Sequence, residues 1–565
     1  MSVDSGSGLS RRQMVAAGTG LIAATATHPA RGGARGRPEA GDGTPEQVHL
    51  TWADDPTRTV VVSWASPGQA EQPRVRIGQR VIAAAERART DALTGAITWT
   101  YHARVDGLRP GATYGYAVTA DNDANRADPF SATFTTAPQG RAAFRFTSFG
   151  DLAAPDPARA GFGHAPDVMP SLVPAPDVPR GPRAASPGDN WQATYAVGAV
   201  ETFQPLFHLL NGDLAYAGLN PAALAQAWRD FGNNIQESAA NRPWLPVPGG
   251  HEPELGNGGQ AVASYLTRYT LPSNGVEGLA GRWYAFRVGT VLFVCLSGDD
   301  VAYSGAARGY SGGAQTRWLE STLAAARGDA SIDWIVVQFH QCACSSAPAG
   351  NGSDLGLRRE WLPLFDTYEV DLVLSGHDHG YERSFPVRGF DAWTGVDAVN
   401  GAVADTGRPH PVTTVDSGVF DTSQGTVHLV LGSGGNGASA PGTAGTTGGA
   451  PRSGDAAVAR VITRPVPAAP DPPGPDGSAR PGADAAETAT WSARRGTTTG
   501  HGIAVFDVNP GSEAGGQTSV TVRYYHTGRA DLAGLAAGVT DDYALFETFT
   551  LVRPRSDGRR WHPKG

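Results

Sequence analysis

Five short apolar runs in the sequence each end at an aspartate or a histidine. The runs begin at residues 144, 206, 244, 334 and 370 and lead to Asp151, Asp213, His251, His340 and the pair His377 and His379. Short apolar runs bounded by turn residues are typical of buried strands. In layered α/β sheets the loops that follow the carboxyl ends of the strands converge on one crevice, where ligands bind. We therefore expect these six side chains to meet.

The residue types at these strand ends favour a metal centre. Carboxylates and imidazoles without a thiolate cluster suit iron, manganese or zinc better than a soft metal. Taken singly, a Gly-Asp pair is usually a turn and a lone histidine is usually a satisfied polar group, so the prediction depends on all five ends together. A glycine precedes four of the residues, and we expect it to let the backbone turn sharply so that the side chain faces inward. These four are Asp151, Asp213, His251 and His377.

The three cysteines set limits on the kind of site and scaffold. Cys295, Cys342 and Cys344 are too few for a cysteine-rich zinc site or for a fold held together by disulfides. Cys342 and Cys344 closely follow His340, but we expect them to pack as small apolar groups and not to ligate. The 54 acidic and 45 basic side chains give a net charge of -9, which argues against nucleic-acid scaffold binding.

Hydrophobic periodicity divides the chain into parts. Residues 45–138 alternate apolar and polar positions over short runs, which predicts an all-β sandwich, and residues 108–116 resemble the tyrosine corner of fibronectin III-like domains. From 139 to 555 apolar strands alternate with amphipathic helices, which predicts a layered α/β domain. The expected helices cover 191–202, 221–238, 315–327 and 357–368, and strands over 502–508, 518–525 and 543–551 are expected to complete its second sheet.

Glycine and proline mark the segments that we expect to be loops. Residues 155–187 hold nine prolines without periodicity, and residues 439–500 are dense in Gly, Ala, Pro and Thr. We interpret the second tract as a flexible insertion and residues 556–565 as a tail.

The N-terminus resembles an export signal. Ser10-Arg11-Arg12-Gln13-Met14 precedes a weakly apolar stretch, as in twin-arginine signals that carry folded proteins across the bacterial inner membrane. We therefore assign residues 1–44 to the signal and a disordered linker, and expect a periplasmic, cell-envelope or secreted protein. No other stretch reaches the roughly 18 apolar residues of a membrane-spanning helix.

The strand ends in this order resemble the metallophosphoesterase signature in its purple acid phosphatase form. The segments that carry the resemblance are Gly150-Asp151, Asn211-Gly212-Asp213-Leu214-Ala215-Tyr216, His340 and Gly376-His377-Asp378-His379-Gly380-Tyr381-Glu382-Arg383. The chain looks closest to the exported actinobacterial branch of that family. The resemblance implies an N-terminal all-β fibronectin III-like sandwich followed by a calcineurin-like domain, a four-layer α/β fold of two mixed sheets flanked by helices.

The resemblance also implies a role for each site residue. Asp151, Tyr216 and His379 match ligands of a ferric ion, and Asp213 matches the carboxylate that bridges two metals. His340 and His377 match ligands of a divalent ion, which in the family is Fe, Zn or Mn. His251 matches a histidine that contacts phosphate and helps to protonate the leaving group.

One position departs from the family pattern. Gly250 stands in Gly249-Gly250-His251-Glu252 where the family has an asparagine that ligates the second metal. Because glycine has no side chain, affinity for the second metal should fall, although water can complete the shell of a hard divalent ion. Asn257 lies seven residues away in a Gly-rich loop and is a poor substitute.

The implied activity is hydrolysis of phosphate monoesters by attack of a metal-bound hydroxide on a phosphorylated small molecule, with inorganic phosphate as a product. Two alternatives stay open. The same metal core serves phosphodiesterases, and Gly250 is compatible with an impaired, phosphate-binding homologue. The sequence leaves the physiological substrate, the second metal and the oligomeric state open.

Overall fold

A computed structural model describes residues 42–92, 94–154, 191–217, 223–253, 262–305, 307–347, 352–392, 394–396, 403–405, 407–435, 458–463, 484–496, 501–527 and 543–558. The proposed export signal and the tract 155–187 lie outside these ranges, so both remain predictions. Among the helices of the described ranges, none is long and apolar enough to cross a membrane.

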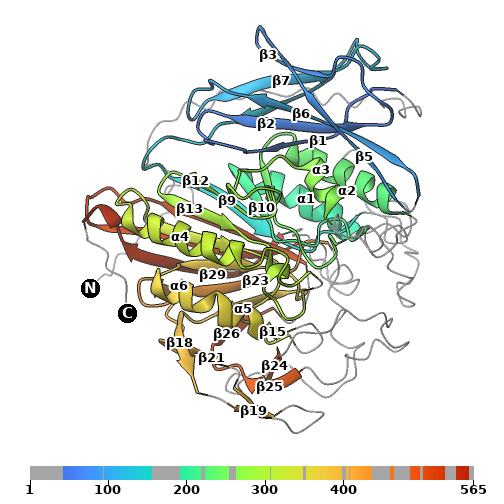
Figure 1. Ribbon diagram of the computed structural model, residues 1–565. Helices are drawn as coiled ribbons and strands as arrows, with labels where there is room; N and C mark the ends of the chain where they lie inside the picture. Colours follow the sequence, from blue (N-terminus) through green and yellow to red (C-terminus); the bar gives the residue numbers. More distant parts are fainter. Residues whose placement is uncertain are drawn as a thin grey trace, which may run out of the picture. The chain divides into compact units, whose positions relative to one another are not determined.

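The N-terminal domain is built from two four-stranded antiparallel sheets (Figure 1). One sheet has the order β1 (Glu46–Thr51), β2 (Val60–Ser66), β6 (Ile97–Val105) and β5 (Ala85–Thr90), and the other β4 (Arg80–Ala83), β3 (Arg74–Ile77), β7 (Thr113–Thr119) and β8 (Phe130–Thr135). Buried side chains of both sheets, including Trp64, Val75 and Tyr101, form one core. The predicted tyrosine corner is present, because the hydroxyl of Tyr114 accepts a 2.8 Å hydrogen bond from the backbone N–H of Arg109.

The following domain contains two seven-stranded mixed sheets. The first has the order β11 (Trp244–Pro246), β10 (Phe207–Leu210), β9 (Phe144–Phe149), β27 (Gly502–Asn509), β28 (Gln517–Thr527), β29 (Tyr543–Pro554) and β22 (Val419–Asp421). The second has the order β12 (Tyr284–Val288), β13 (Val291–Cys295), β14 (Trp334–Gln338), β16 (Leu372–Ser375), β23 (Val427–Leu431), β17 (Tyr381–Ser384) and β26 (Ser492–Arg495). The three predicted C-terminal strands are therefore present as β27, β28 and β29, but they join the first sheet and not the second.

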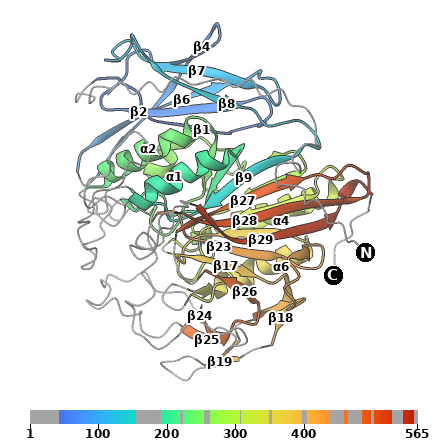
Figure 2. The same ribbon diagram turned by 180° about the vertical axis from the view of Figure 1, so that it is seen from behind.

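Helices cover the outer face of each sheet. The helices are α1 (Trp191–Phe203), α2 (Leu224–Ala239), α3 (Ala263–Arg268), α4 (Ala314–Gly328), α5 (Leu355–Glu360) and α6 (Leu362–Thr367), with 3-10 turns at Gly298–Asp300 and Ser556–Gly558. Both views place α1 and α2 beside the first sheet, while α4 and α6 lie beside the second (Figures 1 and 2). The expected helix over 357–368 is broken at Trp361, and Pro363 follows in the first turn of α6.

Apolar side chains bind the layers together in the way that the four-layer prediction requires. Phe146 of β9 contacts Phe293 of β13 edge-on, with ring centroids 5.1 Å apart, so the two sheets face each other. The next residue, Val294, points to the opposite face and joins a second core with Leu319 of α4 and Phe365 of α6. This alternation is the period of two of a strand, and it lets one strand serve two layers. The predicted fold class is confirmed.

The tract 439–500 is not loop throughout. It contains β24 (Val458–Ile462) and β25 (Asp484–Thr488), which form a small sheet with β15 (Ser353–Asp354), and the edge strand β26. Trp491 is fully buried, and Glu487 pairs with buried Arg358 at 2.6 Å. These anchors contradict a wholly flexible insertion, because one aromatic side chain and one buried ion pair fix a segment whose composition is otherwise typical of loops. Two further two-stranded antiparallel sheets pair β18 (Val387–Asp391) with β21 (Arg408–Pro411) and β19 (Thr394–Val396) with β20 (Val403–Asp405).

Candidate metal centre

The predicted site residues follow the carboxyl ends of five strands. β9, β10 and β11 run parallel in the first sheet, and β14 and β16 run parallel in the second. Their carboxyl ends lead to Asp151, Asp213, His251, His340 and the pair His377 and His379. Because parallel strands end at the same edge of a sheet, and because the two sheets pack face to face, the five loops converge as expected.

One half of the site joins Asp151, Tyr216 and His379. The Tyr216 hydroxyl lies 2.9 Å from Asp151 Oδ1 and 3.1 Å from His379 Nε2. His379 Nε2 is itself 3.4 Å from Asp151 Oδ1. Asp151 and Tyr216 are buried, whereas 30% of the His379 side chain is exposed. Three potential ligand atoms from three separate loops therefore meet at one point.

The other half joins Asp213, His340 and His377, whose ligand atoms all lie within 4.8 Å of one another. His340 Nε2 is 3.0 Å from Asp213 Oδ2 and 3.2 Å from His377 Nδ1. On its far side, His340 Nδ1 lies 2.8 Å from the backbone carbonyl oxygen of Asn211, which accepts a hydrogen bond from it. That bond keeps Nε2 directed at the cluster. In metal-binding histidines, a hydrogen bond from the ring nitrogen that does not bind the metal commonly orients the ring in this way.

His251 lies at the open side of the same cluster. Its backbone N–H donates a 2.8 Å hydrogen bond to Asp213 Oδ1, and its ring Nε2 is 3.8 Å from Asp213 Oδ2. The ring also faces Tyr216, with centroids 4.6 Å apart. The side chain stays 37% exposed, so it is held beside the buried ligand atoms and still reaches solvent.

Several of these residues have a left-handed backbone. The φ angles are 60° at Asp151, 49° at Asp213, 53° at Tyr216 and 71° at His377. Such conformations cost on the order of 1–3 kcal/mol each for residues with a side chain, and they cluster at functional sites. The sharp inward turn that we expected from the preceding glycines is therefore made in large part by the site residues themselves.

The glycines have a different role from the expected one. Only Gly212 has a positive φ, of 82°, whereas Gly249 and Gly376 are needed for close packing. A Cβ atom on Gly249 would lie 2.3 Å from the backbone nitrogen of Asp213, and one on Gly376 would lie 2.5 Å from Asp151 Oδ2. These glycines allow the ligand loops to touch, because no side chain keeps them apart.

Gly250 is the exception in this group. A Cβ atom there would have a single neighbour, Asp213 Oδ1, at 4.0 Å, and its φ lies outside the left-handed range. Neither crowding nor backbone conformation requires glycine at this position. The Cβ atom of an asparagine would meet no closer atom, and its one neighbour, Asp213, belongs to the cluster of Asp213, His340 and His377.

Glu252 is a site residue to which the sequence analysis gave no role. It is buried, and its carboxylate accepts hydrogen bonds from the backbone N–H groups of Gly249, Asp213 and Leu214 at 2.6, 3.0 and 2.8 Å. Burial, and next the charge of Asp213, raise the pKa of Glu252 to about 8. Glu252 thus connects the loop after β11 to the loop after β10. In the sequence, its position directly after His251 was the available signal that it belongs to the site.

Mutual charge interactions determine the protonation of the cluster. Burial lowers the pKa of His340, but the charges of Asp213 and then Asp151 outweigh it and raise that pKa to about 10. For Asp213 burial raises the pKa, and the charge of His340 more than reverses this, so the carboxyl stays ionised. Burial, and then repulsion from His340, lower the pKa of His377 to about 3. One proton is thus held between His340 and Asp213, at the position where the donor atoms converge.

This donor set fits a pair of metal ions. Carboxylate, phenolate and imidazole groups are ligands for Fe, Zn and Mn, and a cation would replace the proton between His340 and Asp213. Asp213 faces both halves of the site. On one side its carboxylate lies beside His340, and on the other it lies beside His251, whose ring faces Tyr216. The arrangement is therefore suited to two neighbouring cations with Asp213 between them.

Comparison with known proteins agrees with this geometry. The model of the purple acid phosphatase N-terminal domain matches residues 45–137, and the calcineurin-like phosphoesterase model matches residues 186–381. The sequence is 36% identical to uncharacterized protein MT2654 of Mycobacterium tuberculosis, over 96% of this chain and 93% of that one. The chain belongs to the purple acid phosphatase family. It is accordingly a metallophosphoesterase-type enzyme with a dinuclear metal core.

Two further members of the purple acid phosphatase family extend the comparison. The Fe(3+)-Zn(2+) purple acid phosphatase 12 of Arabidopsis thaliana is 28% identical over 37% of this chain and 44% of its own length. The structure of purple acid phosphatase PPD1 from yellow lupin, Lupinus luteus, superposes with a TM-score of 0.57 at 17% identity, covering 91% of this chain and 75% of that one. The lupin structure thus shares the fold of both domains.

The remaining residues singled out in the sequence do not join the cluster. Cys342 and Cys344 are buried free thiols, and Cys342 Sγ lies 3.1 Å from the carbonyl oxygen of Gly376, which agrees with packing beside the site. Glu382 and Arg383, the last two residues of the final motif segment, have separate partners. Glu382 accepts a hydrogen bond from the backbone N–H of Ser346, while Arg383 pairs with Glu547 and Asp416.

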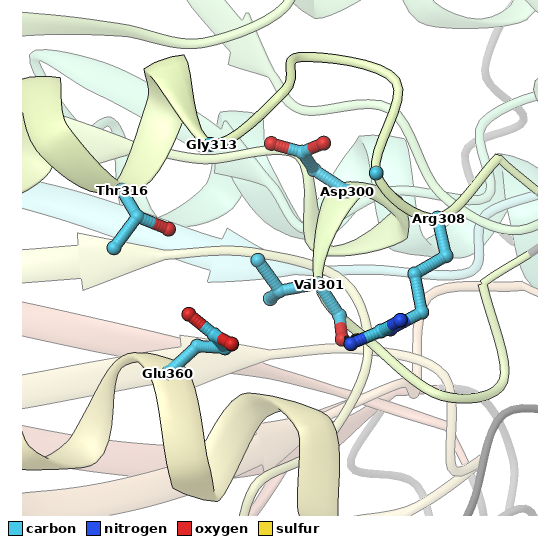
Figure 3. A pocket seen from close by; sticks show the side chains of 7 residues that line it. Asp300, Val301, Arg308, Gly313, Thr316 and Glu360 are labelled. Carbon is cyan, nitrogen blue, oxygen red and sulfur yellow. Dashed lines mark hydrogen bonds between the residues drawn. The ribbon is translucent and has the colours of Figure 1, made fainter.

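A separate pocket of about 140 Å³ lies beside the start of α4 (Figure 3). Asp300, Arg308, Thr316 and Glu360 are among its lining residues. The Asp300 carboxylate already accepts hydrogen bonds from Ser311 and Gln315, and Arg308 donates to the carbonyl of Val301. None of the predicted metal-centre residues lines this pocket.

Proposed function

We propose that the protein hydrolyses phosphate monoesters of small molecules on a centre of one ferric and one divalent ion, and releases inorganic phosphate. The observation that carries the proposal is the convergence of a phenol, two carboxylates and three imidazoles from four loops, with a fourth imidazole at the open side. Those residues are Asp151, Asp213, Tyr216, His340, His377, His379 and His251.

The residues divide into two sets of ligands under this proposal. Asp151, Tyr216 and His379 would hold the ferric ion, His340 and His377 the divalent ion, and Asp213 both. The Fe(3+)-Zn(2+) name of the Arabidopsis relative supports iron with zinc as the first choice. When bound, such a pair supplies Lewis acidity that activates water and neutralises the charge of phosphate.

His251 is the proposed general acid. Its ring is anchored through the backbone bond to Asp213 and the face of Tyr216, but part of it stays exposed, as a group that meets substrate must be. A proton held on this ring would pass to the leaving alkoxide, a contribution of about 10²- to 10⁴-fold for a well-placed acid. The cations that the buried ligand atoms beneath it would hold would neutralise the charge of the phosphate.

Comparison of leaving groups tests this role directly. His251→Ala should slow an alkyl phosphate, whose alkoxide needs a proton, far more than p-nitrophenyl phosphate, whose phenolate leaves without one. Equal slowing of both esters would refute the assignment, provided that the metal content of the variant matches that of the parent.

Monoester and diester substrates separate the leading proposal from the phosphodiesterase alternative. The parent enzyme should hydrolyse p-nitrophenyl phosphate with a higher kcat/KM than bis-p-nitrophenyl phosphate, because the proposed centre binds a dianionic phosphoryl group between two cations. A strong preference for the diester would replace the monoesterase proposal.

Export by the twin-arginine route is the second part of the proposal. Replacing the pair Arg11 and Arg12 by lysines in a bacterial host with this route should retain the protein in the cytoplasm. Unchanged export of that variant would argue against a twin-arginine signal.

A further inference from the structure

The first sheet of the N-terminal domain contacts the carboxyl end of α3, the short helix Ala263–Arg268. The last four carbonyl groups of a helix have no partner within the helix. Here five successive carbonyl oxygens, from Leu266 to Thr270, each lie near a side-chain donor or ring nitrogen of that sheet. Arg87 Nη1 lies 3.2 Å from the carbonyl oxygens of both Leu266 and Tyr269. The carbonyl oxygen of Thr267 lies 3.0 Å from His102 Nε2 and 3.1 Å from Thr100 Oγ1. The carbonyl oxygen of Arg268 lies 3.0 Å from His49 Nε2, and that of Thr270 lies 2.7 Å from Thr51 Oγ1.

These donors come from three strands of one sheet. His49 and Thr51 lie on β1, Arg87 on β5, and Thr100 and His102 on β6. Arg268 and Tyr269 are buried and Leu266, Thr267 and Thr270 are half-buried. A carbonyl withdrawn from water without a donor is costly, so the helix end depends on these side chains for its hydrogen bonds. The positive guanidinium of Arg87 also suits a helix carboxyl end, which carries partial negative charge.

His102 is adapted to this contact. It is buried, and burial, followed by repulsion from Arg87, lowers its pKa to about 3, so the ring is neutral. Ser63 Oγ lies 2.8 Å from Nδ1, which leaves Nε2–H to donate to the Thr267 carbonyl. Both ring nitrogens of the neutral form therefore have partners.

The helix α3 in turn contacts the base of the loop that carries His251. Tyr265 of α3 is buried, and its hydroxyl donates a 3.0 Å hydrogen bond to the carbonyl of Pro246, the last residue of β11. Gly249 to His251 follow a few residues later. At the other end of β11, Leu50 of β1 forms a parallel bridge with Pro243. The N-terminal domain thus holds the chain before β11 and, through α3, the chain where β11 ends.

We propose that the N-terminal domain positions the loop of His251, with Arg87 and His102 acting as positioning residues through α3. The kinetic part of this inference depends on the proposed role of His251 as general acid. A displacement of about 1 Å at a reacting group can lower a rate by about 100-fold, so a modest loosening of this loop has a measurable effect. The N-terminal domain then acts in catalysis without touching the substrate.

The test compares two arginine variants of the full-length holoenzyme. Arg87→Met removes the donor to α3, whereas Arg80→Met removes an exposed arginine of the other sheet, which pairs with Asp106 at 3.2 Å. Arg87→Met should increase hydrogen exchange in residues 244–253 and 262–271. It should also lower kcat for an alkyl phosphate about 10-fold more than for p-nitrophenyl phosphate. Arg80→Met should change neither quantity.

A histidine pair provides a second measurement with a conservative control. His102→Leu removes the donor to Thr267 and should act like Arg87→Met, whereas His102→Gln keeps an N–H donor and should lie closer to the parent. Unchanged exchange in both Arg87→Met and His102→Leu would overturn the inference. Increased exchange with equal slowing of the two esters would also overturn it, because the contact would then be only structural.

The design separates this inference from the proposed function. If His251→Ala itself fails to discriminate between the two esters, the general-acid assignment is at fault. The hydrogen-exchange comparison then still decides whether the N-terminal domain holds the loop, since it needs no turnover.

Discussion

Replacing Gly250 by asparagine should strengthen binding of the divalent ion. Three side chains, Asp213, His340 and His377, converge on that half of the site, and none comes from position 250. A Cβ atom at Gly250 would meet only Asp213 Oδ1, at 4.0 Å, so the added amide can extend toward the same cluster without displacing the backbone. The variant therefore adds a fourth protein ligand to three.

The expected gain follows from that count. Changes at groups that merely support a ligand alter metal affinity by about 10- to 100-fold, and a direct ligand should contribute at least as much. A 10- to 100-fold gain corresponds to about 1.4–2.8 kcal/mol of binding free energy. Because the gain belongs to one half of the site, iron content should stay the same while zinc affinity rises.

Competition with a chelator measures this affinity without relying on turnover. The apparent Kd for zinc would be determined for the parent, Gly250→Asn and Gly250→Ala, each loaded with iron beforehand. The alanine variant adds the same Cβ atom without an amide and should bind zinc like the parent. An equal gain in both variants, or none in the asparagine variant with its fold intact, would refute the reasoning.

Three further outcomes follow from the geometry of the site and its supports. The charges of Asp213 and Asp151 outweigh burial and hold the pKa of His340 at about 10. Binding of the divalent ion should therefore release about one proton at neutral pH, and the affinity for that ion should fall up to about tenfold per pH unit as pH decreases below that pKa. Calorimetry in buffers of different ionisation enthalpy measures the proton release. Gly376→Ala should abolish metal binding, since its Cβ atom would lie 2.5 Å from Asp151 Oδ2, and metal analysis of the purified variant checks this. Arg358→Met leaves the carboxylate of Glu487 buried without its 2.6 Å partner and should cost about 3–5 kcal/mol of unfolding free energy in denaturant melts. Unchanged stability would mean that the 484–495 segment does not anchor the domain.

The sequence was informative where function and local pattern coincide. The apolar runs that end at Asp151 and Asp213 are strands β9 and β10, and their site residues follow as expected. Tyr216 was implied only by the family resemblance of the segment Asn211 to Tyr216, and both it and Asp213 have the left-handed backbone of a tight turn. Local periodicity suffices for the strand ends because the strand and the loop that follows it are contiguous in the chain.

Contacts between distant segments could not be predicted in this way. Arg358 and Glu487 are 129 residues apart, and the second lies in a tract whose Gly and Pro content indicated only loop. The role of Glu252 and the contact between His102 and α3 likewise depend on which backbone groups come near in the folded chain. Composition is an average over a segment, so a few buried, paired side chains within the segment hardly change it.

The sequence by itself determined the five strands that lead to the site, the order of the candidate ligand residues and the absence of a side chain at position 250. Only the tertiary structure decided that Gly249 and Gly376 are required by close packing whereas Gly250 is not, because their surroundings come from other loops. It also decided that the N-terminal domain caps α3, a contact between strands and a helix more than 160 residues apart. Local propensity depends on neighbours in the chain, whereas packing and hydrogen-bond satisfaction depend on neighbours in space.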